Sequence, residues 1–301
     1  MIIHRQSPGR RPLYKYMSPQ TACIVAESRT VRYSSPLTFN DPFDVQAGLH
    51  FSFDIGSLPG KVLSRLDDLA KSPLPPTVDA EDVWGQLVLL VREHYHSHGV
   101  PEVLKTDRGV EPLGRIVSAI RETQRQYQEH WWSRLLPGVR VFCVSEVHDN
   151  LLMWAHYAQD HTGAVFEFWS LPEEDNLLSV AAPVEYVPSP PSFFTEKEFI
   201  DDLLSLKRLD AQSLYRRYAY VKSDHWAYEQ EWRVWYPFSD STDHDLIPIS
   251  TAELKAVYFG CRMDPEVQRR LTTLLRVGFP GARLLKANRR SDAYALEFHD
   301  A

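Results

Sequence analysis

A helical block inside a strand-rich chain sets the main limit on what this sequence can fold into. Residues 56–136 carry helical periodicity, broken by the Pro-rich connector at 72–76. The helices expected there are Lys61–Lys71, Ala80–His98, Pro112–Ser118 and Ala119–Trp132. Strand-like segments lie on both sides of the block. We therefore predict one α+β domain over residues 1–301, with an all-helical insertion at about 56–136.

Short segments on either side of the block predict the sheet and a few helices. The expected strands are Leu13–Tyr16, Thr30–Ser34, Val45–Phe53, Val139–Ser145, Ala164–Trp169, Val180–Val187, Glu229–Tyr236, Ala256–Phe259 and one more at the C-terminal end. The expected helices are Pro19–Glu27, Asn150–Gln159, Glu196–Tyr220 and Pro265–Val277. Ser18 and Asn150 are the residues we expect to cap the first two of these helices.

The amino-acid composition limits which kinds of partner the protein is expected to bind. The net charge of −7 disfavours broad binding of a phosphate backbone, although it leaves room for a local basic groove. The three cysteines are far apart and form no CxxC pair, which fits a reducing compartment. The N-terminal residues lack a signal-peptide core, and no stretch of about 18 apolar residues occurs. We expect a cytoplasmic protein without a membrane partner.

Two carboxylates in an aromatic run are the first candidates for chemistry. If residues 229–236 form a strand, Glu229, Glu231 and Arg233 share one face, because side chains alternate. Carboxylates are costly to bury unless they are paired or used. The pair could hold a sugar and stabilise a developing cation. It could equally be a solvated face, or form salt bridges to Arg233 and Lys222.

Other candidate site residues lie upstream. The strand Tyr14-Lys15-Tyr16 could offer a cation or an aromatic platform, or be an ordinary edge strand. The segment from Ser34 to Asp44 contains Asn40 and predicts Asx-type turns, which can leave N–H groups free to bind an anion or simply brace a loop. Ser145 ends a predicted strand, where site residues commonly lie. Trp154 sits on the short helix that follows, and an isolated helix of this kind more often packs against the core.

Taken as an ordered set, several segments resemble one bacterial family. The matching pieces are Leu13–Tyr16, Tyr33–Pro36, Phe39–Asp44, Cys143–Glu146, Asn150–Tyr157, His161–Gly163, and Trp226 with Glu229–Arg233. In order and spacing they are similar to the family known as domain of unknown function 2971, over most of residues 12–260 apart from the helical block. Val144 departs from the aromatic residue usual in the family. The family name supplies no activity.

A more distant resemblance does imply an activity. An early strand with a basic or aromatic residue, a middle strand ending in Ser and a late Glu-x-Glu strand are similar to the three-part pattern of ADP-ribosyltransferases. That resemblance implies a split mixed or antiparallel β-sheet that holds NAD. The first motif departs from the pattern, because Tyr-Lys-Tyr replaces a clear His or Arg.

The resemblance also implies roles for individual residues. Glu231 would be the catalytic carboxylate and Glu229 the acceptor-side one. The residues expected to contact NAD are Tyr14, Lys15, Tyr16, Tyr33, Ser34, Asn40, Ser145 and Trp154, with Tyr33 or Trp154 stacked on nicotinamide. No metal is expected. We expect Glu231→Gln to abolish transfer and leave the fold intact.

Three functions are therefore consistent with the sequence. The first is an NAD-dependent toxin or phage-defence effector that transfers ADP-ribose to a nucleic acid or a protein, with an antitoxin or regulator as a further partner. The second is a non-catalytic module that binds a nucleotide or a peptide. The third is a metal-dependent nuclease using Asp41, Asp44, Glu229 and Glu231, which would need a lysine near these carboxylates.

Overall fold

The computed structural model describes residues 9–101, 110–208, 210, 214–215, 218–237, 239 and 243–301. The chain forms two compact units. The first, here called the sheet unit, comprises Met1–Gln46, Leu136–Ser189 and Tyr220–Ala301. The second, the helical unit, comprises Ala47–Leu135 and Pro190–Ala219. The helical unit thus contains the predicted insertion at 56–136 together with a later segment of the chain.

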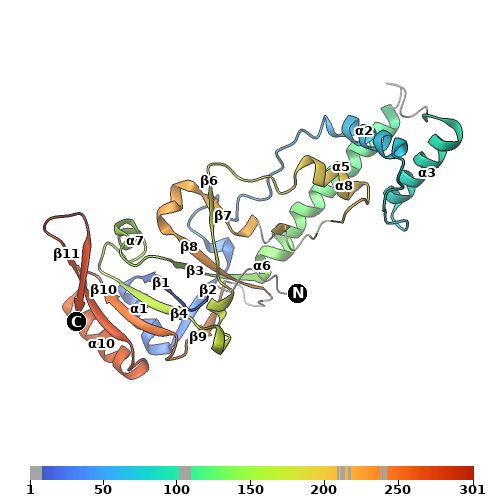
Figure 1. Cartoon of the computed structure of the whole chain (residues 1–301). Coiled ribbons are helices and arrows are strands. Elements are labelled where there is room, and N and C mark those ends of the chain that lie inside the picture. The colour runs from blue at the N-terminus through green and yellow to red at the C-terminus, as the bar shows by residue number, and fades with distance from the viewer. Residues whose placement is uncertain are drawn as a thin grey trace. The chain divides into compact units, whose positions relative to one another are not determined.

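Strands dominate the sheet unit, as expected for an α+β protein (Figure 1). Their bounds are β1 Arg11–Met17, β2 Thr30–Ser34, β3 Val139–Ser145, β4 Ala164–Ser170, β5 Ala182–Pro183, β6 Glu185–Val187, β7 Val221–Ser223, β8 Glu231–Pro237, β9 His244–Pro248, β10 Leu254–Phe259, β11 Arg283–Arg289 and β12 Leu296–Asp300. Among the described residues, ten strands form one large sheet. Its main order is β12-β11-β10-β4-β1-β3-β2-β9, and β8 joins β3 to β5. Among the strand pairs that the described residues form in this sheet, β10–β11 is the only parallel one.

The helices fall into two groups. Those of the sheet unit are α1 Pro19–Ser28, α6 Leu136–Gly138, α7 Leu151–His156 and α10 Pro265–Gly278; those of the helical unit are α2 Leu58–Lys71, α3 Val83–His98, α5 Val110–His130 and α8 Glu196–Leu203. Short 3₁₀ helices span Pro36–Thr38, Pro172–Glu174, Leu177–Val180 and Asp224–Glu229, and a π turn spans Trp131–Leu135. The predicted caps are confirmed, because Ser18 accepts from Thr21 N and Asn150 accepts from Leu152 N and Met153 N. The two helices predicted at 112–132 are one helix, α5.

Strand alternation gives the sheet two apolar faces. On one face, Leu13 and Phe166 belong to a core cluster that also contains Val25 of α1 and Leu271 of α10. On the other face, a smaller aromatic cluster packs against α7. Its buried members are Tyr14, Tyr16, Met153, Trp154, Ala158, Val165, Ala256, Tyr258 and Leu285. Both faces of the sheet are thus buried against helices near β1, and burial supplies the main stabilising free energy.

The sheet splits beside β3. Strand β1 pairs with β4 over seven residues but is paired with β3 only at Tyr14 and Ser145. On the same edge of β3, β2 is paired only at Ser34 and Val141. The opposite edge of β3 pairs with β8 along its whole length. Strands β1 and β2 therefore diverge from β3 and leave a gap in the sheet.

One predicted element is absent and two are wrong in part. Val45–Phe53 is not a strand, because Val45 and Gly48 have φ values of 60° and 82° that an extended strand does not allow. The strand predicted at Val180–Val187 is broken into the end of a 3₁₀ helix, β5 and β6. The helix predicted at Glu196–Tyr220 ends at Leu203, since Ser205 takes a φ of 57°. Part of that prediction, at 209, 211–213 and 216–217, lies outside the described residues.

The helical unit has its own apolar interior. Helices α2 and α3 pack together, with Leu58 and Val62 fully buried. Phe193 and Phe194 stack edge-on near Tyr127 of α5. In the part of the chain that the structure describes, no helix combines the length and apolar character needed to cross a bilayer.

Candidate functional site

A cavity of about 590 Å³ opens at the gap beside β3. Its size is within the range of small-molecule and cofactor sites. All of its lining residues belong to the sheet unit. They are Tyr14, Lys15, Tyr16, Arg32, Ser34, Thr38, Phe39, Asn40, Asp44, Val141, Cys143, Val144, Ser145, Met153, His156, Tyr157, Lys222, Glu229 and Glu231.

The split in the sheet exposes the middle of β3 to this cavity. Cys143 lies midway between the Tyr14–Ser145 and Ser34–Val141 bridges. Lys15 reaches into the gap and its Nζ donates to the carbonyl of Cys143 at 2.6 Å. The amine thus satisfies a backbone acceptor at the point where a neighbouring strand would otherwise pair.

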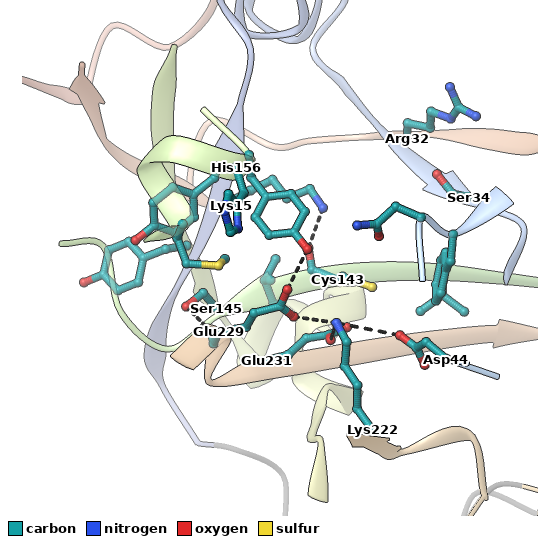
Figure 2. A pocket seen from close by; sticks show the side chains of 18 of the residues that line it. Lys15, Arg32, Ser34, Asp44, Cys143, Ser145, His156, Lys222, Glu229 and Glu231 are labelled. Atoms are coloured by element: carbon teal, nitrogen blue, oxygen red, sulfur yellow. Dashed lines mark hydrogen bonds and ion pairs between the residues drawn. The ribbon is translucent and has the colours of Figure 1, made fainter. Parts of the chain in front are cut away.

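Five charged side chains form a buried network beside the cavity, and Figure 2 labels its members Asp44, Lys222, Glu229 and Glu231. Lys222 Nζ lies 2.5 Å from Glu229 Oε2, 3.0 Å from Glu231 Oε2 and 3.7 Å from Asp44 Oδ2. Arg233 Nε donates to Glu231 Oε1 at 2.7 Å, and its Nη2 donates to Asp44 Oδ2 at 2.5 Å. No member of the network is more than 7% exposed. Burial at this level makes each ion pair strongly dependent on its partners.

The network shifts the pKa values of its carboxyl groups in opposite directions. Burial alone would raise the pKa of Glu231, but Arg233 and Lys222 outweigh it and hold that pKa well below its usual value. Burial raises the pKa of Glu229, and Lys222 only partly opposes the change. Burial likewise raises the pKa of Asp44 against the pull of Arg233. Glu231 is therefore the fixed anion, and Glu229 and Asp44 take up a proton more readily.

Glu229 and Glu231 do converge, but not as two residues of one strand. Glu229 ends the 3₁₀ helix Asp224–Glu229, and β8 begins only at Glu231. Gln230 between them has a φ of 43°, so the backbone turns instead of alternating. The prediction of a shared strand face holds for Glu231 and Arg233 alone. Both glutamates line the cavity, and Lys222 of β7 donates a hydrogen bond to each of them.

Hydroxyl groups fix the position of Glu229. Ser145 Oγ donates to the backbone carbonyl of Glu229 at 2.6 Å, which ties the end of β3 to the turn before β8. Tyr157 Oη donates to Glu229 Oε1 at 2.6 Å. Asn40 lines the same cavity as this tyrosine. Hydrogen bonds thus run from Tyr157 through Glu229 to Lys222.

One buried oxygen of the network is left without a partner. In the part of the chain that the structure describes, Asp44 Oδ1 has no hydrogen-bond partner, although Asp44 is only 3% exposed. An unsatisfied buried carboxylate oxygen costs free energy, which a hydrogen-bond donor on a ligand would recover. Asp44 lines the cavity, so the structure holds an unused acceptor there.

The sequence-predicted site residues mostly meet at this cavity. Those that line it are Tyr14, Lys15, Tyr16, Ser34, Asn40, Ser145, Glu229 and Glu231. Tyr33 does not, because it is buried in the core with its ring stacked on Phe142, the centroids 4.9 Å apart. Trp154 is fully buried against Tyr16 and also lies outside the lining. Neither ring is placed where it could stack on a ligand in the cavity.

Several important residues lie outside the set predicted from sequence. The sequence suggested Lys222 and Arg233 only as salt-bridge partners of the glutamates, and Tyr157 only as the last residue of the matching segment Asn150–Tyr157. Lysine is rarely buried, so its type alone predicts an exposed side chain. The alternation of β8, which places Trp232 and Val234 in the core, is the signal that could have placed Arg233 on the cavity side.

The nuclease hypothesis can be compared with the same geometry. Lys222 does lie among Asp44, Glu229 and Glu231, as that hypothesis required. Asp41 is occupied elsewhere, because its Oδ1 accepts from Phe43 N in an Asx turn. Among the described residues, no group of three or more His, Cys, Asp or Glu side chains is arranged to hold a metal ion. The ammonium and guanidinium groups take the place between the carboxylates that a cation would need.

Comparison with known proteins places part of this site in a family. Residues 153–234 match the family model described as "Protein of unknown function (DUF2971)". This span carries a DUF2971 domain. It includes Tyr157, Lys222 and both glutamates, whereas β1 and Asp44 lie outside it. Comparisons with curated proteins and with solved structures found no match, so they lend no support to the resemblance to ADP-ribosyltransferases.

Proposed function

We propose that the cavity beside β3 binds NAD, and that the chain transfers ADP-ribose from NAD to a nucleic acid or protein acceptor. The observation that carries the proposal is the meeting of three separate segments at one cavity. Lys15 and Tyr16 come from the early strand, Ser145 from the middle strand, and Glu229 and Glu231 from the late segment. The DUF2971 match neither names nor excludes an activity.

The distribution of charge supports this ligand. When all five groups of the buried network are ionised, three carboxylates face two cations and one negative charge is left over. A partly cationic group, such as a nicotinamide ring or an oxocarbenium-like ribose, would balance it. Lys15 and Arg32 lie on the opposite side of the cavity from Glu231 and Asp44, where a pyrophosphate could bind (Figure 2).

Aromatic and polar groups give the same cavity further complementarity to NAD. Tyr14, Tyr16, Phe39 and Tyr157 contribute rings to its lining, and such rings attract flat or cationic groups. The unsatisfied Asp44 Oδ1 is an acceptor for a ribose hydroxyl or a carboxamide N–H.

The chemistry assigned to the glutamates follows from their pKa values. The bond between nicotinamide and C1′ of the ribose breaks, and its electron pair leaves with nicotinamide. Glu231, held ionised, stabilises the positive charge that develops on the ribose. A hydroxyl or another nucleophile of the acceptor forms the new bond at C1′. Its proton passes to Glu229, whose raised pKa suits a general base.

Nicotinamide release from NAD by the purified full chain tests the proposal, with and without cellular RNA or protein as acceptor. We expect release by the wild type and a loss of about 100-fold or more in Glu229→Gln and Glu231→Gln. Tyr157→Phe keeps the ring and removes one hydrogen bond, so we expect a partial loss. Glu27→Gln, at an exposed glutamate of α1, is the matched control and should retain activity.

Three results would contradict this function. The first is equal activity in the wild type and in folded Glu231→Gln. The second is NAD binding without turnover under any acceptor condition, which would favour the non-catalytic module. The third is cleavage of nucleic acid that requires Mg²⁺ or Mn²⁺, which would favour the nuclease.

A further inference from the structure

A second cavity, of about 820 Å³, lies at the turn between β11 and β12. It is lined by Leu151, His161, Cys261, Arg262, Arg289, Arg290, Ser291, Asp292, Ala293, Tyr294, Ala295 and Leu296. All of them belong to the sheet unit, and β11 and α7 are labelled in Figure 1. The cavity shares no lining residue with the one beside β3.

Arginines from two segments far apart in the sequence supply positive charge. Arg262 follows β10, whereas Arg289 ends β11 and Arg290 begins the turn. Arg290 is bound by Asp292 through both carboxylate oxygens, at 3.0 and 2.8 Å. Within the described part of the chain, neither Arg262 nor Arg289 has a carboxylate within 4.0 Å. Arg262 Nη1 donates to the carbonyl of Asp160 at 3.3 Å, so the Arg289 guanidinium and the remaining N–H groups of Arg262 are available to an anion.

An unusual aromatic side chain borders the same cavity. Tyr294 is fully exposed, with a relative accessibility of 101%, although it sits in a short turn between paired strands. A tyrosine usually buries much of its ring, so complete exposure leaves an apolar face without a partner. A flat ring of a ligand could stack on it.

His161 adds a polar atom that has no hydrogen-bond partner among the residues that the structure describes. Its backbone is fixed, because its N–H donates to Trp154 O at 3.1 Å and its carbonyl accepts from Arg262 N at 3.0 Å. Its Nδ1 is buried and makes no hydrogen bond. The ring lies parallel to Trp154, with the centroids 6.2 Å apart. A ligand in the cavity could satisfy this nitrogen.

We propose that this second cavity binds single-stranded nucleic acid. Arg262 and Arg289 contact phosphates, and Tyr294 stacks on an unpaired base. Arginine forks match phosphate oxygens, and a single exposed ring suits a base that is not already stacked in a duplex. A local basic groove of this kind is compatible with the overall charge of −7, which would oppose extended contact with a duplex.

The two cavities lie on either side of one short helix. Leu151 of α7 lines the second cavity, whereas Met153 and His156 of α7 line the first. Trp154 packs between Tyr16 and His161. If the first cavity transfers ADP-ribose, a strand held in the second is the acceptor. That identification rests on the proposed function, whereas strand binding does not.

Fluorescence anisotropy of the full chain with labelled single strands of about ten nucleotides, as RNA and as DNA, tests strand binding without NAD. We expect saturable binding that Tyr294→Ala weakens about tenfold or more. Arg289→Ala should weaken binding and make the negative slope of log K against log salt concentration shallower by about 0.7. Arg276→Ala, at an exposed arginine of α10, is the matched control and should bind as the wild type does.

Each remaining outcome counts against strand binding. Absence of binding at low salt would overturn it, and so would binding that Tyr294→Ala and Arg289→Ala leave unchanged. Competition by a phosphopeptide or by free AMP as strong as that by the unlabelled strand would assign the cavity to another ligand. Because NAD is absent, failure here leaves the proposed NAD chemistry untouched, and failure of NAD cleavage leaves strand binding untouched.

Discussion

Lys222 is the residue on which the first cavity depends. It binds two glutamates that belong to different elements, and it lies 3.7 Å from Asp44. Burial alone would lower its pKa, but the carboxylates outweigh burial and raise it, so the amine stays charged. Removing one member of such a buried group typically destabilises a protein by about 3–5 kcal/mol, because the remaining charges lose their partner.

This network changes what a glutamate substitution should do. From the sequence we expected Glu231→Gln to leave the fold intact. In the structure the Glu231 carboxylate binds both Arg233 and Lys222. The substitution should therefore cost stability as well as activity, and activity must be compared among folded samples.

The stability cost of Glu231→Gln should depend on pH. The folded-state pKa of Glu231 lies below its ordinary value of 4.5, so its contribution is complete above about pH 4.5 and is lost as the pH falls through the folded-state pKa. We expect urea unfolding to show a large difference between wild type and variant at pH 7, and a smaller one at pH 3. A difference that stays constant between these pH values would contradict the assigned ion pairs.

At the residue scale, the acidic members of the buried network were easier to identify from the sequence than the basic ones. Glu229 and Glu231 stand out because carboxylates are rare in an aromatic run. Lys222 does not stand out, since a lysine next to a serine is typical of an exposed segment. Tyr33 and Trp154 were proposed as stacking rings, yet aromatic type does not distinguish a ring in the core from one at a cavity.

At the scale of elements, the positions of the strands along the chain were more predictable than the residues at which they begin and end. Strands β1, β2, β3, β4 and β10 overlap the segments that the sequence predicts as strands. The turn at Gln230 was missed, because a non-glycine residue at positive φ leaves no compositional signal. The divergence of β1 and β2 from β3 is set by tertiary packing, which the pattern of one strand does not contain.

Gly163 allows a close backbone approach in the connection between α7 and β4. It lies between α7 and β4, and its N–H donates to Ala158 O at 2.8 Å. A Cβ at this position would lie 2.0 Å from Met17 O and 2.9 Å from Ala158 O. Both atoms belong to the backbone and cannot move aside easily.

Gly163→Ala should therefore lower the free energy of unfolding by about 1–3 kcal/mol or more. Thermal or urea unfolding measures the change. Gly281→Ala is the matched control, because its Cβ would meet nothing within 4 Å. Equal stability of the two variants would show that the approach of Met17 to Gly163 is not as close as the structure has it.

At the scale of the whole molecule, the chain is divided unevenly between its two units. The helical block at 56–136 was visible in the sequence because helical periodicity extends over many residues. The return of the chain to the helical unit at Pro190–Ala219 was not visible. Phe193 and Phe194 of that segment pack against Tyr127 of α5, a contact between residues distant in sequence that periodicity does not reveal.

The proposed function places every ligand contact of the first cavity in the sheet unit. A ligand that binds only the folded chain stabilises it by about 2.7 kcal/mol at a concentration 100 times its Kd. This stabilisation should slow amide exchange most where the ligand lies. The helical unit contributes no lining residue to this cavity, and its amides serve as an internal reference.

Hydrogen–deuterium exchange with and without saturating NAD is the most direct test of the central claim, that the cavity beside β3 is an NAD site. We predict slower exchange in β1, in residues 36–46, in α7 and in residues 222–231, with little change in α2 and α3. Asp44→Asn should weaken this protection, because it alters a carboxylate whose buried Oδ1 has no hydrogen-bond partner among the described residues. Unchanged exchange in these four segments at saturating NAD would contradict the account, as would protection confined to the helical unit.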